Sequence, residues 1–179
     1  MSLPETPVFI PVDFMQDFLQ ESFEQIGCSQ EESVRVTRRL IGANLRGHES
    51  HGVARMPRYV EWVQNGTLIP NQQIQLIQEN EVISILDGGH GFGQSIGEQA
   101  VQIGIEKSLT QGVSVTALRN SGHLGRIGDW AELAAGSNVA SLHMVNVRGS
   151  LLVAPFEGVE RRGSTSPFCC GIPRADEPP

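Results

Sequence analysis

The spacing of apolar residues changes part-way along this 179-residue chain, and that change limits the fold more than any other feature. Up to about residue 65, apolar residues recur every three or four positions, as they do on one face of a helix. From Ile74 onward they alternate or form short runs, which is typical of strands separated by turns. We therefore predict a helical region over residues 1–70, joined to a partial mixed α/β region over residues 71–179.

The first region is expected to hold three helices. Asp13 is the predicted N-cap of the first helix, which ends at Gly27. The run Ser29–Glu32 has the pattern of a capping box and opens a second helix, which stops at Gly47. The third helix is predicted over residues 55–64.

The second region alternates strands and helices. The expected elements are two strands around a turn at Glu79–Asn80, a helix over 96–109, a strand over 113–118, a helix over 130–135 and a strand over 139–145. From Val147 onward the sequence is typical of loops. Because no helix or strand is predicted to close the region after Cys170, the sheet looks unfinished and the chain is expected to be a fragment.

Composition excludes several classes of function. Hydrophobic content of 39% and charged content of 18% are ordinary for a globular protein. A net charge of −7 opposes binding to nucleic acid. The sequence shows neither a signal-peptide pattern nor an apolar run long enough to span a membrane, so a cytoplasmic protein without membrane contact is expected. Three cysteines, two of them adjacent, do not form a disulfide framework.

His51 and Arg55 are the first candidates for chemistry. Histidine titrates near neutral pH, so His51 suits proton transfer to a carbonyl or imine. Arg55 could bind a carboxylate through two parallel hydrogen bonds, on the same helical face as His51 if the third helix begins early enough. Ser50 also suggests a nucleophile, but adjacent side chains rarely meet in the geometry this requires. The structural alternative is a capping histidine beside a solvated arginine.

Two glycine-containing stretches follow strands. Gly91–Gly97 is placed like a dinucleotide-binding turn, but its third glycine is one position too late for that motif. The next strand also ends in Arg119 and Asn120 instead of an acid. We therefore interpret this stretch as a flexible turn that needs glycine backbone angles. Asn120–Gly125 lies between a strand and a helix, where ligands bind in α/β sheets, although an ordinary turn explains it equally well.

Four stretches together resemble the type-2 malate/L-lactate dehydrogenase family, which includes ureidoglycolate and sulfolactate dehydrogenases and piperideine- and pyrroline-2-carboxylate reductases. They are Leu45–Tyr59, Asn120–Gly125, Ala154–Gly158 and Ser164–Pro167. The resemblance implies a mixed, non-Rossmann α/β fold with a helical N-terminal region. Since family members are roughly twice as long, it also implies that this chain is an N-terminal half and is inactive alone. Glu49 and Ser166 depart from the family pattern, which has Asp and often Asn there.

The resemblance implies three groups of site residues. The catalytic group is Ser50, His51 and His123, with either histidine as the acid or base. The substrate-binding group is Arg55, Tyr59 and Thr165. The cofactor, NAD or NADP, would be bound by the α/β region through His123, Leu124, Gly125, Arg126, Ile127 and Asn146. No metal site is expected.

The implied function is hydride transfer between NAD(P)H and C2 of a 2-hydroxy or 2-keto acid, such as malate or lactate, by a homodimer. One alternative is an NADPH-dependent reductase of a cyclic 2-imino acid. Two others belong to different classes of protein: an inactive fragment that acts only in assembly, and a metal-dependent hydrolase built on His48, His51 and His123.

Overall fold

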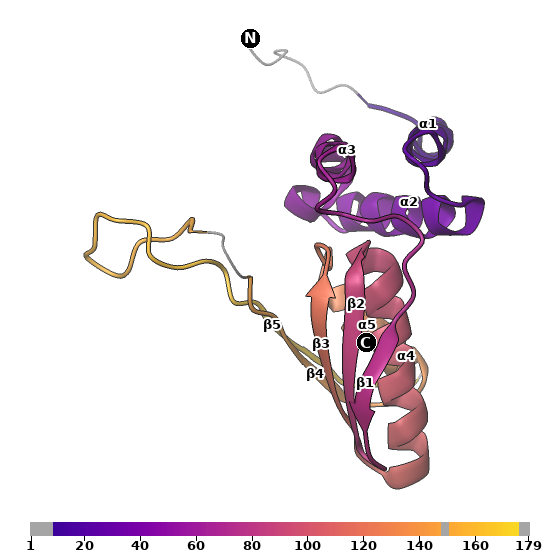
Figure 1. The fold of residues 1–179 in the computed structure, drawn as a ribbon, viewed down its shortest axis with the longest axis vertical. Coiled ribbons are helices and arrows are strands. Elements are labelled where there is room, and N and C mark those ends of the chain that lie inside the picture. The colour runs from indigo at the N-terminus through magenta and orange to yellow at the C-terminus, as the bar shows by residue number, and fades with distance from the viewer. Residues whose placement is uncertain (1–8, 148–150, 176–179) are drawn as a thin grey trace. The chain divides into compact units, whose positions relative to one another are not determined.

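A computed structural model describes residues 9–147 and 151–175, in which three helices are followed by a region that mixes strands and helices (Figure 1). The elements are α1 (Val12–Gln25), α2 (Gln30–Leu45), two 3₁₀ turns (Glu49–His51 and Val53–Arg55), α3 (Met56–Gln64), β1 (Gln75–Glu79), β2 (Ile83–Gly91), α4 (Gly93–Gln111), β3 (Val115–Ser121), α5 (Gly128–Gly136), β4 (Ser141–Met144) and β5 (Phe168–Gly171). These elements confirm a mixed α/β fold that begins with helices.

The chain forms two compact units that interleave along the sequence. The first unit contains residues 9–75, 87–96 and 119–126. The second contains residues 76–86, 97–118 and the described residues from 127 onward. Each unit therefore combines segments that are distant in the sequence.

The three-stranded sheet has the order β1-β2-β3. The short connection over residues 80–82 makes β1 and β2 an antiparallel hairpin. β3 runs parallel to β2, because Val115 N donates to Val82 O at one end and Gly122 N donates to Gly91 O at the other. α4 supplies the crossover between these two strands. The sheet is therefore mixed, as the resemblance implies.

Several details differ from the sequence-based expectation. Asp13 does not cap α1: the N-cap is Pro11, and Asp13 lies in the first turn, where a carboxylate favours the helix dipole. α4 begins at Gly93, earlier than predicted, because Ser95 N and Ile96 N donate to Phe92 O and close its first turn. The loop predicted after Val147 contains β5, which is too short to show a periodic pattern and pairs antiparallel with β4.

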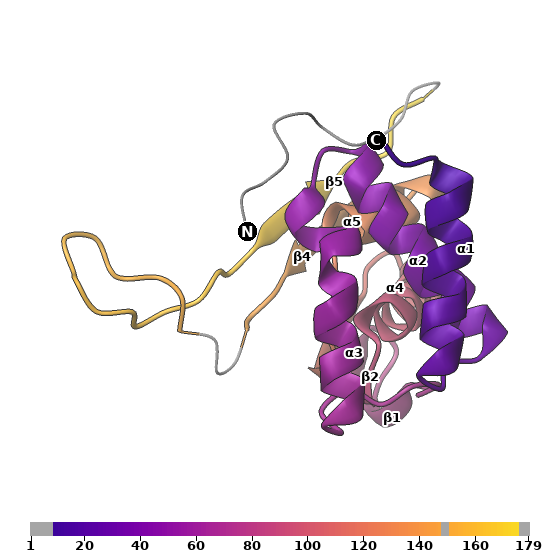
Figure 2. The ribbon, with the colours of Figure 1, turned by 90° about the horizontal axis from the view of Figure 1, so that it is seen from above.

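The three N-terminal helices of the first unit lie together (Figure 2), and their buried side chains form one core. Phe23 is fully buried, and its ring meets Phe92 edge-on at a centroid distance of 5.9 Å. Tyr59 packs against the same two rings at centroid distances of 6.5 Å and 5.8 Å. Of the apolar side chains on α1, however, Phe14 and Phe18 remain exposed. Tyr59, a predicted substrate-binding residue, is thus part of the core.

Asn71 joins the turn between α1 and α2 to the chain that leads into β1. Asn71 Oδ1 accepts a hydrogen bond from Ser29 N at 2.7 Å, and Asn71 Nδ2 donates to Gly27 O at 2.8 Å. Ser29 Oγ accepts from Glu32 N, as a capping box requires. The return bond of the box is absent, since the Glu32 carboxylate accepts from Asn71 N instead. The predicted bond from Glu32 N to Ser29 Oγ is therefore confirmed, and the predicted bond to Ser29 N is wrong. Asn71 Oδ1 accepts from Ser29 N in its place.

Replacing Asn71 with alanine removes two side-chain hydrogen bonds. It also places alanine, which adopts a positive φ less readily than asparagine, at a φ of 62°. We expect Asn71→Ala to lower the free energy of unfolding by about 2 kcal/mol, measured by urea denaturation. Asn71→Gly removes the same hydrogen bonds but adopts the positive φ without strain, so it isolates the loss of the hydrogen bonds. Gln73→Ala, at an exposed neighbouring position, is the control. An unchanged midpoint in both Asn71 variants would contradict this role.

Gly52 separates the two 3₁₀ turns that precede α3. Any residue can adopt its φ of −94°, but the space beside Gly52 does not admit a side chain. Asn44 Oδ1, which accepts a hydrogen bond from Val53 N at 2.8 Å, would lie 1.7 Å from a Cβ on Gly52. The break that Gly52 permits delays α3 until Met56. His51 therefore does not share one regular helical face with Arg55, contrary to the condition set from the sequence.

Gly52→Ala should force the Asn44 side chain out of its hydrogen bond. We expect a loss of about 1–3 kcal/mol in the free energy of unfolding, as in other overpacked sites. Gly136→Ala is the matched control, because nothing lies within 4 Å of a Cβ at that helical position. It should leave stability unchanged or raise it slightly. Equal urea midpoints for the two variants would show that Gly52 is not fixed by space.

Candidate active site

The structure brings the rings of His51 and His123 together in the first unit. Their centroids are 5.1 Å apart and their planes differ by 30°. His51 lies on the 3₁₀ turn after α2, and His123 lies on the loop that follows β3. The His48 ring contacts His51 edge-on at 4.4 Å. The two predicted acid/base candidates are thus neighbours, although their catalytic roles stay predictions.

Ser50 holds one ring nitrogen of His51. Ser50 Oγ and His51 Nδ1 are 2.9 Å apart, so the adjacent side chains do meet, unlike most neighbouring pairs. The tight 3₁₀ turn over Glu49–His51 makes this contact possible. The hydroxyl can donate to a neutral His51 ring or accept from a charged one. Nε2 is then the His51 nitrogen left to meet a ligand.

Arg55 is tied to the same turn through its side chain. Arg55 Nε donates to Ser50 O at 2.5 Å. Among the described residues, neither terminal nitrogen of Arg55 has a hydrogen-bond partner. The backbone bond fixes the base of the planar guanidinium and leaves its outer edge for a ligand. Two parallel N–H groups on such an edge match a carboxylate.

His123 is connected to the core through Tyr59. Tyr59 Oη lies 2.8 Å from His123 Nδ1 and accepts a hydrogen bond from Gln94 Nε2 at 2.8 Å. Tyr59 and Gln94 are each only 1% exposed. Gln94 was not predicted from the sequence. The one available signal was a single amide side chain in the glycine-rich and apolar stretch 91–97. In the structure all residues of this stretch are buried.

Burial sets the charge state of these groups. Burial, followed by the charges of Arg55 and His51, lowers the pKa of His123 to about 4. Burial, His48 and Arg55 also hold the pKa of His51 below its usual 6.5. Burial raises the pKa of Tyr59 to about 12. At neutral pH, His123 is therefore uncharged and Tyr59 carries its proton.

The loop that carries His123 is held by Asp87. The Asp87 carboxylate accepts hydrogen bonds from Gly89 N at 2.9 Å, Arg119 Nε at 2.9 Å and Asn120 Nδ2 at 2.8 Å. These bonds, the one from Gly89 N first, hold the pKa of Asp87 below its usual value. Arg119 and Asn120, which replace the acid expected of a dinucleotide-binding strand, thus have a structural partner on β2.

Gly93 allows this loop to approach α4. A Cβ on Gly93 would lie 2.2 Å from His123 O, so only glycine fits. Gly93 is helical and has no unusual φ. No glycine of the stretch Gly91–Gly97 has a positive φ, so the prediction that this stretch needs glycine backbone angles is wrong. At Gly93, glycine is needed for space.

The other predicted site residues are divided between the units. The first unit contains Leu124, Gly125 and Arg126, on the same loop as His123. The second unit contains three, namely Ile127 at the start of α5, Asn146 after β4 and Thr165 before β5. The side chains of Asn146 and Thr165 are exposed in the described part of the chain. Their roles stay predictions.

No group of three or more His, Cys, Asp or Glu side chains in residues 9–147 and 151–175 is arranged to hold a metal ion. No helix in these ranges is both long and apolar enough to cross a membrane.

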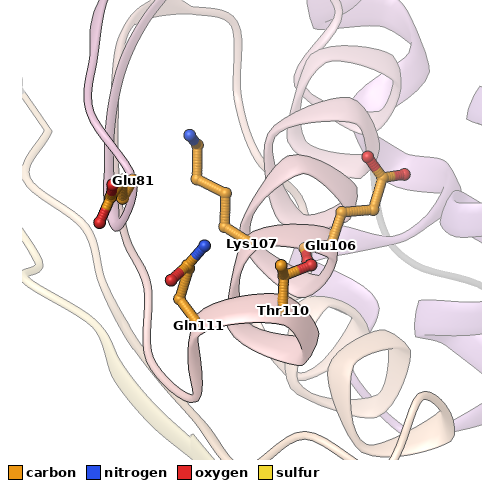
Figure 3. A pocket seen from close by; sticks show the side chains of 5 residues that line it. All are labelled: Glu81, Glu106, Lys107, Thr110 and Gln111. Atoms are coloured by element: carbon orange, nitrogen blue, oxygen red, sulfur yellow. The ribbon is translucent and has the colours of Figure 1, made fainter.

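An open depression of about 340 Å³ lies in the second unit (Figure 3). It is lined by Glu81, Glu106, Lys107, Thr110 and Gln111. The Lys107 ammonium group already pairs with Glu79 at 2.9 Å and donates to Asn80 O at 2.7 Å. None of the predicted site residues lines this depression, so it supplies no part of the candidate site.

Comparison with known proteins identifies relatives along the chain. The malate/L-lactate dehydrogenase family matches residues 10–179. Hydroxycarboxylate dehydrogenase B of Escherichia coli K12 is 41% identical over 165 residues, which are 92% of this chain and 46% of that protein. Malate dehydrogenase of Pyrococcus abyssi is 38% identical over 97% of this chain and 48% of its own length. The chain thus spans about half the length of these curated relatives.

The fold agrees with these relatives. The structure of malate dehydrogenase from Pyrococcus horikoshii superposes with a TM-score of 0.90 and 32% identity, covering 99% of this chain and 51% of that one. Sulfolactate dehydrogenase from Methanocaldococcus jannaschii gives a TM-score of 0.85 at 27% identity, over 92% of this chain and 47% of that one. Sequence and fold therefore agree, and the chain belongs to the malate/L-lactate dehydrogenase family.

Proposed function

We propose that the protein carrying this chain transfers a hydride between NAD or NADP and C2 of a 2-hydroxy or 2-keto acid, with malate and lactate as the first candidates. The observation that carries the proposal is the outer edge of Arg55, which has no hydrogen-bond partner among residues 9–147 and 151–175, beside the neighbouring rings of His51 and His123. A carboxylate anchor next to two imidazoles suits an acid whose neighbouring carbon bears the reacting oxygen.

Arg55 would bind the substrate carboxylate. Its bond to Ser50 O limits the movement of the guanidinium, so less side-chain freedom is lost when a ligand binds. The net charge of the chain is −7, and Arg55 supplies the local positive charge that an anionic substrate needs. The carboxylate would then hold C2 next to the two histidines.

His51 would exchange a proton with the C2 oxygen through Nε2, while Ser50 holds Nδ1. In reduction, the C2 carbonyl oxygen takes the proton from charged His51, and oxidation returns it to the neutral ring. The nicotinamide cofactor, when bound, supplies or accepts the hydride.

The cofactor would be held by His123–Ile127 and Asn146. The loop follows the carboxyl end of β3, beside parallel β2, where α/β sheets bind ligands. Arg126 places a cation on this loop, which suits the phosphates of a dinucleotide. The stretch Gly91–Gly97 would not act as a dinucleotide-binding turn, because the His123 backbone packs against Gly93 and fills the space beside it.

The names of the relatives favour a hydroxy acid over a cyclic imino acid. The two proteins at 38–41% identity are a malate dehydrogenase and a hydroxycarboxylate dehydrogenase. Because the chain spans about half of their length, we assign the activity, and a homodimeric state, to the whole protein that carries it.

The proposal is tested by following nicotinamide absorbance with both cofactors and a panel of malate, lactate, sulfolactate, ureidoglycolate and cyclic imino acids. Turnover of a 2-hydroxy acid is expected. Arg55→Lys should raise KM by about 10- to 100-fold, since an ammonium cannot form the paired bonds of a guanidinium. Arg58→Lys is the control, as Arg58 is exposed and pairs with Glu61 on α3. Absence of both NADH and NADPH binding would refute the proposal.

The pH dependence tests the role of His51. Because its pKa lies below 6.5, kcat/KM for reduction should rise as the pH falls through that pKa, and oxidation should fall over the same range. His48→Gln removes a neighbouring imidazole whose charge lowers this pKa, so the limb of the profile should move to higher pH. A limb that stays in place or moves to lower pH would exclude His51 as the titrating group.

A further inference from the structure

Gln94, Tyr59 and His123 form a buried line of hydrogen bonds. The two links, Gln94 Nε2 to Tyr59 Oη and Tyr59 Oη to His123 Nδ1, are each 2.8 Å long. Gln94 and Tyr59 are 1% exposed, so water does not compete for these groups. A tyrosine hydroxyl has one proton to donate. The group at the Gln94 end therefore decides which way the proton at the His123 end points.

The amide of Gln94 presents its N–H group to Tyr59. Its other atom, Oε1, is buried and accepts no hydrogen bond from the described residues. Turning the amide over would place the NH₂ group, with two donors, where Oε1 now finds no partner. Buried N–H groups without a partner are rarer in proteins than carbonyls without one. The observed orientation is therefore favoured, and Tyr59 donates its proton to His123 Nδ1.

We propose that Gln94 and Tyr59 are positioning residues that keep the neutral His123 ring in a single tautomer, with its proton on Nε2. His123 would then meet the C2 oxygen of the substrate as a hydrogen-bond donor, and His51 would be the group that exchanges the proton. This consequence rests on the proposed function. The tautomer itself is a property of the chain without substrate.

The surroundings of His123 support a neutral ring. Arg55 and His51 face it from the two 3₁₀ turns, and Tyr59 faces it from α3. The two cationic or cationisable neighbours oppose a third positive charge, and burial does the same. A neutral imidazole whose Nδ1 accepts a hydrogen bond has Nε2 as its only donor.

The tautomer can be read directly by long-range ¹H–¹⁵N NMR on the whole chain labelled with ¹⁵N-histidine at neutral pH. Loss of its signals in His123→Gln identifies the ring. A single neutral tautomer protonated at Nε2 is expected. In Tyr59→Phe, which removes only the hydroxyl, and in Gln94→Met, which removes the donor, signals of the Nδ1-protonated form should appear. A charged or Nδ1-protonated ring in the unsubstituted chain, or an unchanged tautomer in Tyr59→Phe, would overturn the proposal.

Ser95→Ala is the matched control. Ser95 follows Gln94 on α4, is equally buried, and its hydroxyl has no hydrogen-bond partner in the described part of the chain. Its removal should leave the His123 spectrum unchanged. If the expected tautomer is found but the natural protein does not turn over hydroxy acids, the proposed function is wrong and the positioning role of Gln94 and Tyr59 is supported. If turnover is found with the proton on Nδ1, the positioning role is wrong and the proposed function is supported.

Discussion

The Tyr59 hydroxyl is the group on which the arrangement of the candidate site depends. Its ring packs against Phe23 and Phe92 in the aromatic core, where burial of apolar surface holds α3 in place. A hydroxyl in such a core must find polar partners, because a buried polar group without one costs free energy. Gln94 and His123 are those partners. The packing of a helical core thereby fixes a histidine on a distant loop.

Positive charge is concentrated on one group in this site. Burial and the charge of Arg55 both favour the neutral forms of His51 and His123. An anionic acid would therefore meet one permanent cation and two rings that can donate or exchange protons.

The sequence predicted the parts of the fold that depend on local pattern. The period of apolar residues located the helices and the β1–β2 hairpin, and Gly27 and Gly47 marked helix ends with positive φ. It did not predict β5, whose four residues become a strand only through pairing with β4. Nor could it show that Gly52 and Gly93 are required for space, since Asn44 and the His123 backbone approach them through tertiary contacts.

The candidate site was predictable to a similar extent. The resemblance singled out Ser50, His51, Arg55, Tyr59 and His123, and the structure places all five in one unit. Gln94 was not predicted, because a single amide in a glycine-rich and apolar stretch does not indicate a buried hydrogen bond until the core around it is known.

The proposed site requires Arg55, His51 and His123 to act on one substrate molecule. A crystal structure of the natural protein with the reduced cofactor and a non-reducible 2-keto acid analogue tests it most directly. We expect a carboxylate on the terminal nitrogens of Arg55 and a C2 oxygen within about 2.6–3.2 Å of Nε2 of both histidines. A carboxylate bound away from Arg55, or a C2 oxygen beyond the reach of both rings, would contradict it.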